Sequence, residues 1–160
     1  MLEWLDTTAL STWLKESPSV WSQPMVLTLH TMGLSVLVGG CGVLDLRLLG
    51  VSRGIPLAAF RWVFRAVAIG LTVNILTGIL LFIKNPVTWA SSIPFLIKML
   101  LVIASVATVV PIRRYVLSDA VLSGAANREV AANIRLLAVV SIVAWSSAVT
   151  AGRLLAYVQP

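Results

Sequence analysis

The sequence contains a single histidine, His30, which lies near the start of a long apolar stretch from Pro24 to Gly50. The same stretch carries Asp45 and Arg47 near its other end. Ionisable side chains inside a membrane-spanning helix are costly, and by default they are candidates for function. A neutral imidazole is also a common ligand for a metal or for haem iron. His30 is therefore the residue around which chemistry is sought first.

Polar side chains on the other apolar stretches fall at a similar depth to His30. At about 1.5 Å per residue, His30 and Lys98 each lie about six residues inside their helices. Asn74 and Thr77 lie about eight to eleven residues from the same end of the second helix, and Arg153 about four to seven residues from that end of the fourth. We call these five residues the polar layer. Three of them can carry positive charge and no carboxylate accompanies them, so the layer could bind an anion.

Haem b is one concrete ligand for the polar layer. His30 would be an axial ligand, and the lysine and arginine would pair with the propionates. Gly33, one turn after His30, would leave room for a flat macrocycle, and Met99 or Met32 could supply a sixth ligand. A small anionic substrate or a quinone is the second candidate.

Other interpretations of these residues are structural. The two cations of the layer could extend to the membrane interface, and His30 could simply hydrogen-bond to a neighbouring helix. A copper site built from His30, Met25, Met32 and Cys41 is disfavoured, because Cys41 lies about three turns from His30 on one helix.

Asp45 predicts a different kind of site. A carboxylate near the C-terminus of a helix opposes the helix dipole and requires a cation. Arg65, Arg113 and Arg135 all fall at the same end of their helices. We expect a structural charge latch between Asp45 and these arginines, in preference to a proton relay.

Composition identifies the class of protein. Of 160 residues, 59% are hydrophobic and 11% charged, against roughly a quarter charged in soluble proteins. The mean hydropathy is +0.97. The net charge of +6 comes from cations placed between apolar stretches, which indicates membrane topology and not nucleic-acid binding. No nucleophile–base set or pair of carboxylates is present, so an enzyme is not predicted.

The apolar pattern predicts an all-α membrane protein with one domain, residues 1–160, built as an up-down four-helix transmembrane bundle. An N-terminal amphipathic helix is expected to lie on the membrane surface. Pro111 is expected to kink or end the third span. The predicted elements are the interfacial helix at 2–16 and spans at about 24–50, 57–84, 93–115 and 128–157.

The cations also predict orientation. Most of the cations lie next to two loops, the one between spans one and two and the one between spans three and four. The positive-inside rule then places both termini outside, which in a bacterium is the periplasmic face of the inner membrane. Small residues recur on the spans, for example Gly70 and Gly78, and would allow close helix packing.

Four segments resemble an uncharacterised family of short bacterial four-helix inner-membrane proteins, classed as a domain of unknown function. They read T-L-H at 28–30, D-L-R-L-L-G at 45–50, I-K-M-L at 97–100 and A-G-R at 151–153. The resemblance implies an inner-membrane four-helix bundle and brings no established activity. Many members of that family have a second histidine before the basic pair that closes span three, where this chain reads Val110-Pro111-Ile112.

The sequence therefore predicts a membrane protein with a haem b or anionic-ligand site in the outer leaflet, and a redox accessory role. Lipid is the expected surrounding, with a homo-oligomer or a membrane complex as the possible assembly. The alternatives are a non-catalytic structural or assembly protein, and a small transporter. A transporter is less favoured because no inverted repeat is visible.

Overall fold

Four long helices dominate the computed structural model, which describes residues 2–118, 121 and 130–158. Each contains an apolar segment long enough to cross a membrane. They are α3 (Gln23–Leu49), α4 (Val63–Lys84), α6 (Ile93–Val116) and α8 (Ala132–Val158). The predicted all-α, four-helix transmembrane class is confirmed.

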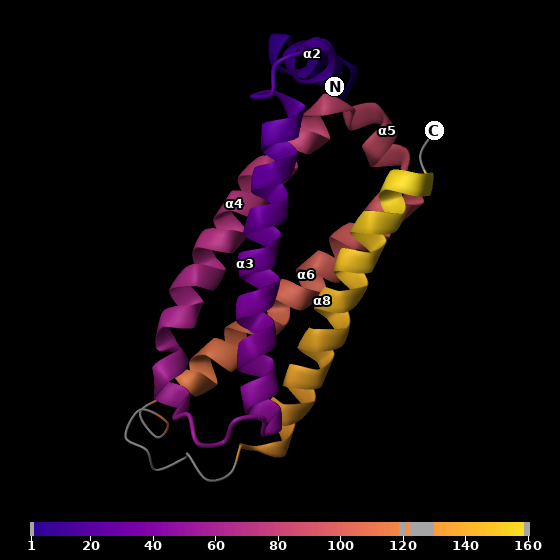
Figure 1. The fold of residues 1–160 in the computed structure, drawn as a ribbon. Helices are drawn as coiled ribbons and strands as arrows, with labels where there is room; N and C mark the ends of the chain where they lie inside the picture. Colours follow the sequence, from indigo (N-terminus) through magenta and orange to yellow (C-terminus); the bar gives the residue numbers. More distant parts are fainter. Residues whose placement is uncertain (1, 119–120, 122–129, 159–160) are drawn as a thin grey trace.

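The four helices form two antiparallel pairs (Figure 1). Helix α3 packs along α4, α6 packs along α8, and α3 joins the pairs by packing on α8. Helices α4 and α6 make few contacts with each other. The N-terminal helices and the last turn of α8 lie at one end of the bundle, which we call the terminal end (Figure 1). The opposite end carries most of the arginines, and we call it the arginine end.

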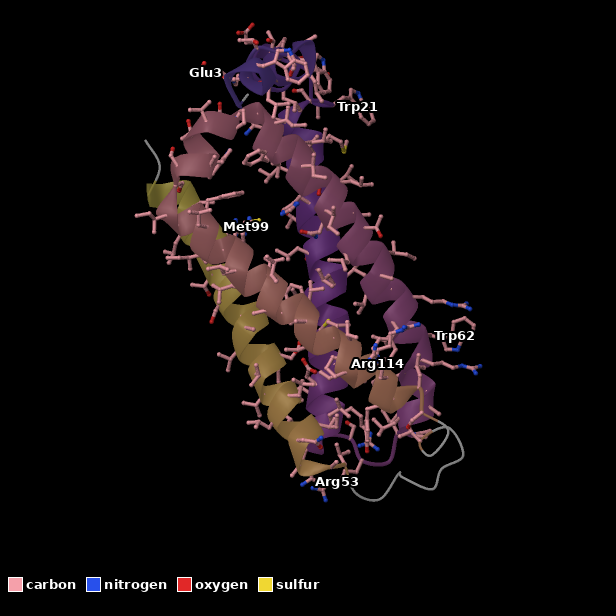
Figure 2. The ribbon with its side chains drawn as sticks, turned by 180° about the vertical axis from the view of Figure 1, so that it is seen from behind. Glu3, Trp21, Arg53, Trp62, Met99 and Arg114 are labelled. Carbon is pink, nitrogen blue, oxygen red and sulfur yellow. The ribbon has the colours of Figure 1, made fainter. Side chains whose placement is uncertain are left out.

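Large apolar side chains cover the outside of the bundle. Ile69 of α4 is 65% exposed and Leu100 of α6 is 68% exposed, although both lie well inside their helices. Trp21 at the terminal end and Trp62 at the arginine end are also exposed (Figure 2). Aromatic rings at both ends of an apolar band are typical of the two membrane interfaces. The chain is a multi-pass integral membrane protein.

The N-terminal segment forms two short helices and not the single helix predicted for residues 2–16. They are α1 (Leu2–Asp6) and α2 (Ala9–Glu16). Thr8 separates them because its hydroxyl accepts a hydrogen bond from the Ser11 N–H at 3.3 Å and so caps α2. Ser11 in turn donates to the Lys84 carbonyl at 3.3 Å, which attaches α2 to the end of α4.

The helices differ in detail from the predicted spans. The second span begins as a 3₁₀ helix, η1 (Leu57–Trp62), and then continues as α4. A further short helix, α5 (Pro86–Ser91), joins α4 to α6. Pro111 does not end α6, which continues to Val116. Residues 128 and 129, the first of the predicted fourth span, lie outside the described residues, as do residues 119, 120 and 122–127 before them.

The apolar core is concentrated at the arginine end. Leu48, Leu57, Ile112 and Val116 are essentially inaccessible there and come from α3, η1 and α6. A second, smaller cluster near the middle of the bundle includes Trp145 of α8. The arginine end is therefore closed by side chains from all the spans, and the polar layer lies beyond this core toward the terminal end.

Candidate functional site

The polar layer is built first on the contact between α3 and α4. His30 Nδ1 lies 2.9 Å from the hydroxyl oxygen of Thr77. The side-chain amide of Asn74 donates to the His30 carbonyl at 3.1 Å. The sequence placed these three residues at one depth, and the structure brings them into direct contact.

The hydrogen bonds around Thr77 favour one tautomer of His30. The Thr77 hydroxyl donates to the Val73 carbonyl of its own helix at 2.6 Å. With its proton given to Val73, the Thr77 oxygen can only accept, which favours the tautomer in which His30 Nδ1 donates and Nε2 keeps its lone pair. Nε2 has no hydrogen-bond partner among the described residues. This is the arrangement in which a histidine is oriented through one nitrogen and available as a ligand through the other.

The sequence suggested that Gly33 leaves room for a macrocycle, but the structure shows that it does not. It is buried by α4, and a Cβ added to it would lie 3.0 Å from the Asn74 amide nitrogen and 3.2 Å from the Gly70 carbonyl. Gly70 of α4 lies equally close to α3: a Cβ added to it would lie 2.8 Å from the Gly33 carbonyl. The missing side chains allow the two backbones to touch. Any ligand of His30 must therefore lie away from Gly33.

Lys98 reaches the polar layer from the other helix pair. It is half-buried on α6, and its side chain lies against Gly152 of α8, where an added Cβ would stand 3.4 Å from Lys98 Cε. Its ammonium is within electrostatic range of His30. Met99 follows it in the terminal half of α6 (Figure 2). Arg153 is exposed, so the structure places it at the surface of α8.

The predicted charge latch is wrong: Asp45 forms no ion pair with Arg65, Arg113 or Arg135 among the described residues. Asp45 is only 1% exposed, whereas Arg65, Arg113 and Arg135 are all exposed. Within the described part of the chain the ion pair that forms is Lys15–Asp6, at 2.7 Å. Long arginine side chains at a helix end extend to the interface more easily than they turn into an apolar core.

Asp45 instead faces α8 inside the bundle. It lines a cavity of about 10 Å³ together with Cys41 and Ser141. Asp45 Oδ2, Ser141 Oγ and Trp145 Nε1 are buried and lack hydrogen-bond partners among the described residues. A cavity of that volume is at the lower limit for one water molecule. The sequence alone could not place Ser141 or Trp145 near Asp45, because they lie on α8, about a hundred residues further along the chain.

Arg47 has a role that the sequence alone did not indicate. It is buried, and its guanidinium donates to the carbonyls of Ile55 at 2.7 Å and Arg53 at 3.1 Å. Gly50 ends α3 in a left-handed conformation (φ 106°), which turns the chain back toward Arg47. Arg47 thus fixes the loop that joins the first two spans. In the sequence, the one indication of this turn was Gly50, a residue type that often ends helices, three residues after Arg47.

These observations define a class: a four-helix integral membrane protein with a polar layer near one end of the bundle. Comparisons with protein-family models, curated proteins and solved structures give no match. The resemblance to the bacterial four-helix family therefore stays a prediction.

Proposed function

We propose that this membrane protein binds an anionic prosthetic group, haem b, between its two helix pairs in the terminal half of the bundle. The observation that supports this is the state of His30. Its Nδ1 is held by Thr77 and its Nε2 has no partner among the described residues. A histidine held in this way is suited to ligate iron through Nε2.

Lys98 supports the same proposal from the opposite helix pair. It brings a cation into a half-buried position, and no carboxylate of the described residues pairs with it. A propionate would supply the missing negative charge. Met99, the next residue of α6, would offer a thioether to hold the group from the same helix. Haem b held there would supply one-electron transfer, and the protein would be an accessory redox component.

The visible spectrum tests the proposal. Protein purified in detergent from haem-replete cells should show a Soret band, and His30→Ala should abolish it. Asp45→Asn is the control, because Asp45 lies fifteen residues, or about 22 Å, from His30 along α3, and it should keep the band. A colourless wild-type preparation, or a band that His30→Ala retains, would overturn the assignment.

A second function is favoured by the same hydrogen bonds. The His30–Thr77 and Asn74–His30 contacts join α3 to α4 whether or not a ligand is present. Interhelical hydrogen bonds in membranes contribute about 0.6 kcal/mol on average. On this account the protein is a structural or assembly subunit and is colourless.

A further inference from the structure

We propose that the groove between α4 and α6 at the arginine end binds an anionic phospholipid. The groove has a volume of about 610 Å³. It exists because α4 and α6 make few contacts with each other, although each packs closely on another helix. Its volume is within the range of small-molecule sites, about 300–1,000 Å³.

Three arginines give the groove its charge. Arg61 and Arg65 line it from the α4 side and Arg113 from the α6 side. All three are exposed, and none of the described residues that line the groove is acidic. Arginine guanidinium groups bind phosphate through paired hydrogen bonds. The charge of the groove therefore favours a phosphate-bearing headgroup.

Trp62 holds two of these guanidinium groups in place. The Arg65 guanidinium lies 4.3 Å from the centre of the Trp62 ring, and that of Arg61 lies 5.3 Å from it. Cation–π contacts of this kind restrict the guanidinium groups without neutralising them. The ring itself is exposed at the arginine end of the bundle (Figure 2), where tryptophans meet lipid headgroups.

The rest of the groove is apolar and follows the helix axis. From Arg61 in η1 to Leu71 in α4 the lining extends about 15 Å, at about 1.5 Å per residue. Toward the middle of the bundle it consists of side chains such as Val67, Ala68 and Val109. Charge at the interface and apolar walls at depth match the two ends of a phospholipid. A free phosphate would use only the first of them.

Lipid binding by the purified protein tests the proposal. The protein is incubated in neutral detergent with phosphatidylglycerol or phosphatidylcholine, and bound lipid is measured by native mass spectrometry. Phosphatidylglycerol should bind more tightly than phosphatidylcholine. The double variant Arg65→Gln/Arg113→Gln should weaken its binding about 30-fold, since each cation near the surface contributes about fivefold.

The matched control is Arg53→Gln/Arg135→Gln, which removes the same charge at the same end but outside the groove. It should bind phosphatidylglycerol as the wild type does. Equal weakening in both double variants would mean general surface attraction and would overturn the site. Equal binding of the two lipids by the wild type would overturn it as well.

A third variant separates a lipid from a headgroup alone. Ala68→Trp fills the apolar part of the groove and leaves the arginines in place. It should weaken binding of phosphatidylglycerol at least tenfold. Glycerol 3-phosphate should not displace the lipid from the wild type. Unchanged lipid binding by Ala68→Trp, or displacement by glycerol 3-phosphate at similar concentration, would show that the apolar groove is not used.

Discussion

His30 and Asp45 lie on one helix, but their surroundings differ. His30 contacts polar groups of α4 and keeps one nitrogen without a partner among the described residues. Asp45 is enclosed by apolar and weakly polar side chains, and the described arginines do not reach it. A buried carboxylate without a cation is destabilising. Only the first of these residues is therefore part of a candidate binding site.

Asp45→Asn should leave the melting temperature unchanged or raise it. The substitution keeps the shape of the side chain, removes the charge, and provides an amide that can hydrogen-bond to Ser141. Thermal unfolding in detergent measures the effect. Arg47→Gln is the comparison, because losing its two bonds to loop carbonyls should lower stability by about 1–3 kcal/mol. A marked drop for Asp45→Asn would show that Asp45 has a cation partner after all.

At the scale of the helices, glycines determine how closely α3 and α4 approach. Gly70→Ala should destabilise the protein by about 1–3 kcal/mol, because its Cβ would meet backbone atoms of α3 at 2.8 and 2.9 Å. Gly39→Ala on α3 is the matched control, since no atom lies within 4 Å of its added Cβ. Melting temperatures of the two variants check this. Equal values would contradict the close α3–α4 contact.

The helices themselves could be predicted from the sequence, because long apolar stretches bounded by proline, glycine and charged residues leave few alternatives. The contacts could not. Counting residues gave the depth of Gly33 and Asp45 but not the face of the helix on which each lies. Gly33 faces α4, and Asp45 faces Ser141 of α8. Similarly, Thr8 divides the N-terminal segment through a local cap that apolar periodicity does not register.

At the scale of the whole molecule, the separation of charge predicts orientation in the membrane. Arg53, Arg61, Arg65, Arg113 and Arg135 are exposed at the arginine end, opposite α2 and the last turn of α8 (Figure 1). In a bacterial inner membrane, a reporter active only in the periplasm should work when fused after residue 160. It should fail when fused after Arg53. The reverse pattern would contradict the positive-inside assignment and place the polar layer in the inner leaflet.

In the proposed function, His30 is a ligand and not only a link between helices. His30→Asn tests it most directly. The asparagine amide nitrogen can take the place of Nδ1 and keep the hydrogen bond to Thr77, but nothing replaces Nε2. His30→Asn should lose the Soret band of the wild type and keep a wild-type melting temperature once haem is removed from both. A colourless wild type, or a His30→Asn protein that still shows the band, would contradict it.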